Sequence, residues 1–201
     1  MGDRSAAGGG NRKDILGQVP NALSIGRIAA APLLFALAWT RHETAYAVLL
    51  AAALLSDVVD GWLARALGVQ SPRGAKLDSI GDVLMLASAA YGIAVFHPKV
   101  YLEHATGCGI VLGGWILVGV LALPRYGRLP SFHTYASKAA GCLLAVFICA
   151  LFLSGFHPWL FRAAVAVSAF ASAEELLLLR WLPGWRTDVR GAWWIRKERR
   201  G

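Results

Sequence analysis

Six apolar stretches without Asp, Glu, Lys or Arg occupy about half of this chain. They cover 28–40, 44–56, 83–98, 104–124, 139–161 and 163–173. A helix needs about 20 residues to cross the roughly 30 Å hydrocarbon core of a bilayer. Only 104–124 and 139–161 reach that length, so any further spans must carry charged residues inside or close to the membrane. Because 57% of the residues are hydrophobic and 16% are charged, we expect lipid to be the main solvent of this chain.

Turn and breaker residues separate the apolar stretches, among them Pro72, Pro98, Pro130 and Pro158. The pattern predicts an all-α, polytopic membrane protein with six transmembrane helices. The expected helices are 20–40, 43–68, 76–97, 105–123, 136–155 and 158–181. The expected domain organisation is a disordered tail over 1–10, a single transmembrane domain over 11–185 and a basic, aromatic interfacial tail over 186–201.

The net charge of +8 has an explanation in membrane topology. With six spans, seventeen of the twenty Lys and Arg fall on the side that holds both termini, and only Arg41, Lys99 and Arg162 fall on the other. The positive-inside rule places both termini in the cytoplasm. We therefore expect an integral protein of a bacterial inner membrane, and the basic charge gives no support for a nucleic-acid partner.

Cysteine and glycine spacings add little chemistry. Cys108, Cys142 and Cys149 lie in apolar runs without a CxxC pair, which supports neither a zinc site nor a disulfide framework. Gly109 and Gly113 form a GxxxG spacing that predicts close helix packing within the chain.

Four aspartates stand out because they lie at the ends of two expected spans. Asp57 and Asp60 share one face of the helix expected at 43–68, and Asp78 and Asp82 share one face of the helix expected at 76–97. A short cytoplasmic turn joins these helices, so we expect the two faces to meet. Carboxylates at membrane depth mark a functional site by default. The alternative is a set of helix-end acids solvated at the interface.

Four carboxylates this close raise one another's pKa unless a cation neutralises them. An all-oxygen ligand set suits Mg²⁺, Mn²⁺ or Ca²⁺, and two carboxylates from each helix can hold two ions about 4 Å apart. Small residues share the same faces and would let a ligand approach the backbone closely. They are Gly61, Ala64 and Gly74.

Residues 57–82 read D-x-x-D-G-x-x-A-R, eight residues, then G-x-x-x-D-x-x-x-D. This segment resembles the signature of the CDP-alcohol phosphatidyltransferases, and every fixed position of that signature is present. Pro20-Asn21-Ala22-Leu23-Ser24 with Arg27 resembles the start of the first helix in many members. The resemblance covers about residues 19–97. The start of the first helix favours the phosphatidylglycerophosphate and cardiolipin synthase branch, although Val83 follows the last aspartate where that branch often has a lysine, and Asp78-Ser79 looks more like the members that use serine or inositol phosphate.

The resemblance implies transfer of a phosphatidyl group from CDP-diacylglycerol to an alcohol, with release of CMP and with two Mg²⁺ or Mn²⁺ ions as cofactors. It implies that Asp57, Asp60 and Asp78 hold the metals, and that Asp82 deprotonates the acceptor and also touches a metal. By the same resemblance the CDP-donor lies against Gly61, Ala64 and Gly74, with Arg65 near its phosphates. A homodimer is also implied.

The acceptor stays open. Glycerol 3-phosphate is favoured over serine, inositol phosphate and phosphatidylglycerol. The residues expected to contact a substrate phosphate are Asn21 and Arg27 in the first expected helix, and Arg128 and Lys138 in the stretch before 139–161. As plain positive-inside charges, Arg128 and Lys138 would look the same in the sequence. A divalent-cation transporter is the rival class, because intramembrane acids also line ion pathways.

Overall fold

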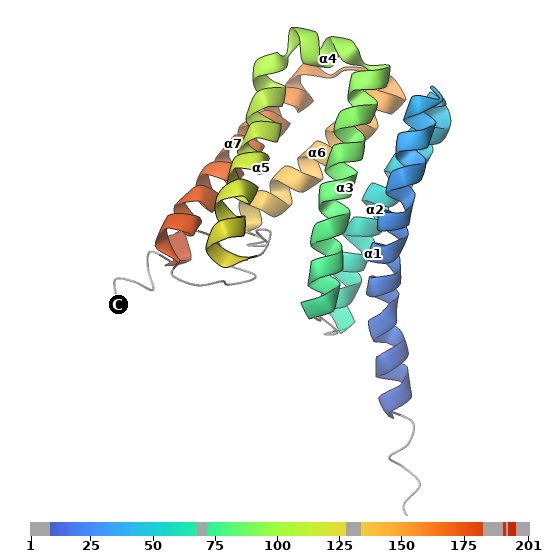
Figure 1. The fold of residues 1–201 in the computed structure, drawn as a ribbon, viewed down its shortest axis with the longest axis vertical. Helices are drawn as coiled ribbons and strands as arrows, with labels where there is room; N and C mark the ends of the chain where they lie inside the picture. Colours follow the sequence, from blue (N-terminus) through green and yellow to red (C-terminus); the bar gives the residue numbers. More distant parts are fainter. Residues whose placement is uncertain (1–8, 68–71, 128–133, 183–190, 192, 196–201) are drawn as a thin grey trace, which may run out of the picture. The chain divides into compact units, whose positions relative to one another are not determined.

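The computed structural model describes residues 9–67, 72–127, 134–182, 191 and 193–195, with side chains from Ala22 onward except those of 58, 60–67, 72, 73 and 75. All regular elements in these residues are helices, as the sequence predicts (Figure 1). They are α1 (Gly9–Trp39), α2 (Glu43–Leu67), α3 (Pro72–Phe96), α4 (Pro98–Glu103), α5 (Ala105–Tyr126), α6 (Tyr135–Ser154) and α7 (Pro158–Trp181).

The six long helices match the six expected ones closely, and two differences have local causes. α1 begins at Gly9 rather than near residue 20, so the helix includes the polar residues before the first apolar stretch. The short helix α4 was not expected, since its six residues are too few for a span. Residues 1–8 of the disordered tail predicted over 1–10 lie outside the described residues, whereas Gly9 and Gly10 belong to α1. Most of the tail predicted over 186–201 also lies outside them.

Helix ends follow ordinary capping chemistry. Thr134 begins α6 by accepting a 3.1 Å hydrogen bond from the backbone N–H of Ser137. α5 ends at Gly127, whose φ of 65° is in the left-handed region and whose N–H donates to the Leu123 carbonyl. Pro158 stands in the first turn of α7, where its missing N–H costs nothing. These residues set the joints between apolar stretches.

Four helices are long and apolar enough to cross a membrane. The spans are Ala22–Trp39, Lys76–Phe96, Ala105–Tyr126 and Tyr135–Ser154, found among the described residues. α5 exposes Ile110, Trp115, Ile116 and Val120, side chains that water disfavours and lipid tolerates. The chain is therefore an integral membrane protein.

The helices form two compact units, residues 1–97 and 98–201. In the first unit, α1 packs extensively on both α2 and α3, while α2 and α3 contact each other less. The centre of this unit is apolar and includes Leu34, Tyr46, Leu50 and Met85. α1 therefore joins the two helices that carry the aspartates.

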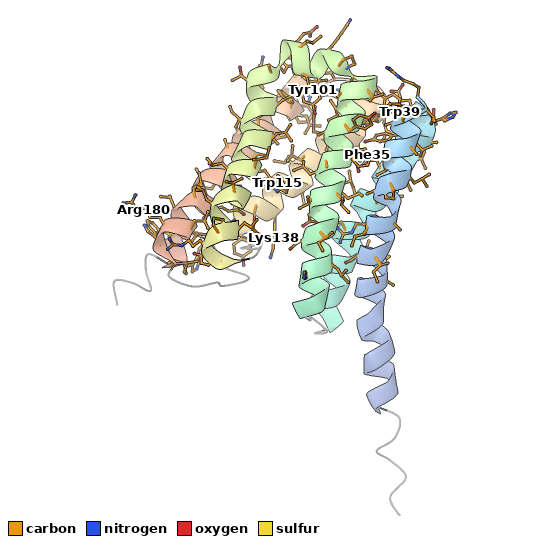
Figure 2. All side chains as sticks on the ribbon, viewed as in Figure 1. Phe35, Trp39, Tyr101, Trp115, Lys138 and Arg180 are labelled. Atoms are coloured by element: carbon orange, nitrogen blue, oxygen red, sulfur yellow. The ribbon has the colours of Figure 1, made fainter. Side chains whose placement is uncertain are left out.

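In the second unit, α7 packs against both α5 and α6. Val118 and Ala122 of α5 form a buried cluster with Leu178 and Leu179 of α7, and Ile195 from the C-terminal segment joins them. Lys138 at the start of α6 and Arg180 near the end of α7 lie at the same end of this unit (Figure 2).

Candidate metal centre

Three of the four predicted aspartates come together in the first unit. Asp57 of α2 and Asp78 and Asp82 of α3 each offer a carboxylate oxygen, and these oxygens lie within 4.8 Å of one another. The two helices therefore bring their acidic faces together as their spacing predicts. An all-oxygen set of this kind matches the ligands that Mg²⁺ and Mn²⁺ prefer, so the three residues can hold a divalent ion.

A guanidinium group stands among the three carboxylates. Arg27 of α1 donates from Nη1 to Oδ1 of Asp57, from Nη2 to Oδ1 of Asp78 at 2.7 Å, and from Nη1 to Oδ1 of Asp82 at 3.2 Å. Charge-assisted bonds of this type are among the stronger hydrogen bonds in proteins. Each of the three helices of the unit thus contributes to one ionic cluster.

Burial divides the cluster into a closed side and an open side. The Arg27 side chain is 1% exposed, whereas those of Asp57, Asp78 and Asp82 are 41%, 31% and 46% exposed. The carboxylates are accessible to an ion or a substrate, and the guanidinium is not. The open side is thus the side on which ligands can reach the site.

Residues around Arg27 leave space for the guanidinium and fix it. Ser24, one turn earlier on α1, has its hydroxyl oxygen 3.4 Å from Arg27 Nη2. A Cβ atom at Gly81 of α3 would lie 3.6 Å from Arg27 Cζ, so a side chain longer than alanine would press on the group. Ser24 and Gly81 are thus part of the support of the site.

Several predicted site residues cannot be placed in detail. Arg128 lies outside the described residues, and so do the side chains of Asn21, Asp60, Ala64 and Arg65. Gly61 is known only as a position within α2, one residue after Asp60. Gly74 lies in the first turn of α3, one turn before Asp78. The roles that the resemblance implies for these residues stay predictions.

The second unit holds the remaining predicted cation, Lys138, which is exposed in the first turn of α6. Arg125, a neighbouring cation, donates from Nη2 to the Leu182 carbonyl at 3.2 Å. Tyr126 donates to the same carbonyl at 2.8 Å. Arg125 therefore closes the C-terminus of α7, while Lys138 keeps an exposed charge.

The pairing of Arg27 with the aspartates is the feature that spacing alone does not predict. Arg27 was expected to contact a substrate phosphate, and the contacts that the structure gives it are to carboxylates. A signal was present, because a cation deep in an apolar helix needs a partner of opposite charge. The four aspartates were the available partners.

Comparison with known proteins supports the motif. The family of CDP-alcohol phosphatidyltransferases matches residues 17–171, which include all of the site described above. No solved structure matches the chain significantly.

Curated relatives match over shorter segments. A cardiolipin synthase (CMP-forming) of Oryza sativa subsp. japonica is 38% identical over 35% of this chain and 22% of its own length. A CDP-diacylglycerol–glycerol-3-phosphate 3-phosphatidyltransferase of Arabidopsis thaliana is 40% identical over 35% of this chain and 25% of its own. The corresponding protein of Pseudomonas fluorescens is 32% identical over 51% of this chain and 53% of its own length.

The chain thus spans about half or less of the length of the curated relatives that it matches. The family match itself covers most of the chain and both helices that carry the aspartates. The chain therefore belongs to the CDP-alcohol phosphatidyltransferase family.

Proposed function

We propose that this protein is a membrane enzyme of phospholipid synthesis that transfers a phosphatidyl group from CDP-diacylglycerol to an alcohol and releases CMP. The observation that carries the proposal is the cluster of Asp57, Asp78 and Asp82, whose carboxylate oxygens meet within 4.8 Å inside the family-matched segment. Their open side allows a nucleotide headgroup and an acceptor to reach them.

The family uses a divalent metal, and we assign the ligands to Asp57, Asp60, Asp78 and Asp82, for two ions of Mg²⁺ or Mn²⁺. When bound, such ions supply positive charge next to the diphosphate oxygens of the donor. Gly61, Ala64 and Gly74 leave room for the cytidine nucleotide, and Arg65 binds its phosphates. These residues hold the donor while the acceptor approaches from the open side.

Asp82 is assigned as the general base. It is the most exposed of the three clustered aspartates, so an acceptor hydroxyl can reach its carboxylate. Asp82 takes the hydroxyl proton, the oxygen forms a bond to the phosphorus that carries the diacylglycerol, and the bond from that phosphorus to CMP breaks. CMP leaves with the electron pair of the broken bond.

Glycerol 3-phosphate is the favoured acceptor. The support comes from relatives in Arabidopsis thaliana and Pseudomonas fluorescens whose names include this acceptor. Arg128 and Lys138 are the candidates for its phosphate. Phosphatidylglycerol, serine and inositol phosphate are the alternatives, the first because a further relative is named a cardiolipin synthase.

The proposal includes the topology that the sequence predicts. All six long helices span a bacterial inner membrane, both termini are cytoplasmic, and the aspartates open toward the cytoplasm. The support is the distribution of Lys and Arg and the position of the cluster near the turn between α2 and α3. The enzyme is a homodimer in this proposal.

One assay tests the reaction. Purified protein receives CDP-diacylglycerol, Mn²⁺ and one acceptor at a time, and CMP release and the lipid product are measured. We expect CMP and phosphatidylglycerophosphate with glycerol 3-phosphate, loss of both in EDTA, and recovery with Mg²⁺ or Mn²⁺. Full CMP release in chelator overturns the metal assignment. Transport of Mg²⁺ into liposomes, without release of CMP from CDP-diacylglycerol in the presence of any acceptor, favours the transporter class instead.

A further inference from the structure

Arg27 and the three aspartates that it pairs with differ strongly in their exposure to solvent. Arg27 is one of the most completely buried side chains among the described residues, while its three carboxylate partners are each about one-third to one-half exposed. A substrate phosphate would have to enter the closed side of the cluster to reach this guanidinium. Its position favours a role directed at the aspartates themselves.

The aspartates need a cation when no metal is bound. Three carboxylates with oxygens within 4.8 Å repel one another, and the repulsion grows at the low dielectric of a membrane-embedded site. Arg27 touches all three, and it cannot lose its proton. Its charge therefore offsets the repulsion whether or not an ion is present.

Arg27 in turn needs the carboxylates. A buried guanidinium without carboxylate partners carries a large desolvation penalty. α1 packs on both α2 and α3, while these two helices contact each other less. Arg27 therefore joins the two acidic helices from the helix that packs on both of them. The ion pairs hold the carboxylates in place before a metal arrives.

We propose that Arg27 is the built-in counter-cation of the metal centre: it holds Asp57, Asp78 and Asp82 together in the metal-free protein and weakens the affinity of the site for divalent ions. This inference rests on the proposed function only in taking the three aspartates as metal ligands. Arg27 is thus a positioning residue, which acts through the carboxylates and not on the substrate.

The charge of Arg27 should change the affinity for a divalent ion in a defined direction. A fixed positive charge about 5 Å from a divalent ion weakens binding on the order of tenfold, even at the dielectric of water. Removing the charge therefore tightens metal binding while it destabilises the metal-free protein. A residue with a packing role alone would destabilise the metal-free and metal-bound proteins equally.

The experiment compares wild type with Arg27→Gln and Arg27→Lys in detergent, without substrate. Mn²⁺ binding is followed by electron paramagnetic resonance of the free ion, and Tm is measured with and without saturating Mn²⁺. We expect Arg27→Gln to bind Mn²⁺ on the order of tenfold more tightly. Its Tm should fall without metal, and Mn²⁺ should raise it by more than in wild type. Arg27→Lys, which keeps the charge, should bind Mn²⁺ as wild type does.

A double variant guards against simple misfolding. In Arg27→Gln with Asp57→Asn, one negative charge leaves with the positive one, so the metal-free Tm should rise above that of Arg27→Gln alone. Unchanged or weaker Mn²⁺ binding in Arg27→Gln overturns the proposal. So does an equal fall of Tm with and without Mn²⁺, or a double variant less stable than the single one.

These readouts separate this inference from the reaction. If wild type binds Mn²⁺ and Arg27→Gln binds it more tightly, but no CMP is released in the presence of any acceptor, the counter-cation role stands and the proposed reaction fails. If wild type releases CMP normally and Arg27→Gln leaves Mn²⁺ affinity unchanged, the reaction stands and only the role of Arg27 is rejected.

Discussion

Tyr46 of α2 donates a 2.6 Å hydrogen bond from its buried hydroxyl to the Ser88 carbonyl of α3. The same ring contacts Phe96, with centroids 5.3 Å apart, and occupies the space beside Gly92. This contact joins the two acidic helices at a distance from the aspartates. It is the part of the first unit whose effect on stability can be separated from the chemistry of the site.

Substitutions at this contact should lower stability in proportion to what they disturb. Tyr46→Phe removes one buried hydrogen bond and should cost about 1 kcal/mol of unfolding free energy. Gly92→Ala places a Cβ where the Tyr46 ring stands and should cost about 1–3 kcal/mol. Unfolding in mixed detergent micelles measures both. Gly26→Ala is the control, because a Cβ there meets no atom within 4 Å. A loss at Gly26 equal to that at Gly92 would contradict this account.

The second unit offers a matched pair of glycines on α5. A Cβ at Gly107 would lie 2.7 Å from the Phe161 ring, which belongs to an aromatic group with His104, Phe147 and Phe156. A Cβ at Gly109 would meet no atom within 4 Å. Gly107→Ala should therefore cost about 1–3 kcal/mol, and Gly109→Ala should stay within about 0.5 kcal/mol of wild type. Thermal unfolding in detergent compares the two, and equal losses would reject the packing argument.

Sequence reasoning predicted the helices well because two simple signals agreed. Apolar stretches set the interiors of the six long helices, and residues such as Thr134, Gly127 and Pro158 set their ends. The short helix α4 was not predicted, because six residues are too few to show a helical periodicity. The polar start of α1 was not predicted, because an apolar stretch marks only the residues that lipid can surround and not the polar helical turns before them.

Interactions between helices were harder to predict than the helices themselves. The spacing of Asp57, Asp78 and Asp82 predicted that they meet, and they do. It did not predict that α1 packs on both acidic helices, because pairing among helices depends on side-chain fit. The GxxxG spacing at Gly109 and Gly113 predicted close packing within the chain, but within the described part of the second unit no atom lies within 4 Å of either Cβ position. Small residues permit a close contact without requiring one.

Removing a single ligand should weaken metal binding, which is the opposite of the effect expected on removing Arg27. Asp57→Asn and Asp78→Asn each replace an anionic oxygen by a neutral amide, so Mn²⁺ affinity should fall on the order of tenfold or more. Mn²⁺ titration followed by paramagnetic resonance measures the affinity. Glu43→Gln is the control, since Glu43 lies at the first residue of α2, away from the cluster. Wild-type affinity in both aspartate variants would exclude these residues as ligands.

Asp82→Asn separates the base from the ligands. If Asp82 accepts the acceptor proton, this variant should lose turnover by a factor on the order of 10²–10⁴. CDP-lipid binding should stay largely intact, because Asp57, Asp60 and Asp78 still serve the donor. Single-turnover CMP release and equilibrium binding of CDP-diacylglycerol measure the two effects. Normal turnover in this variant would show that another group takes the proton.

The acceptor can be tested with two exposed cations at one end of the second unit. Lys138 lies in the first turn of α6 and Arg180 lies near the end of α7 (Figure 2). If the acceptor carries a phosphate that Lys138 binds, Lys138→Ala should raise its KM on the order of tenfold, the loss of one charge-assisted contact. The KM for CDP-diacylglycerol should hardly change.

Arg180→Ala removes the same charge from the same end of the unit and should leave both KM values near wild type. Equal effects of the two substitutions would mean that these cations act only through topology or surface potential. An unchanged acceptor KM in both Lys138→Ala and Arg128→Ala would reject a phosphate-binding pocket made by these residues. The favoured acceptor would then be one without a free phosphate, because such an acceptor has no need of these charges, and serine becomes the first to test.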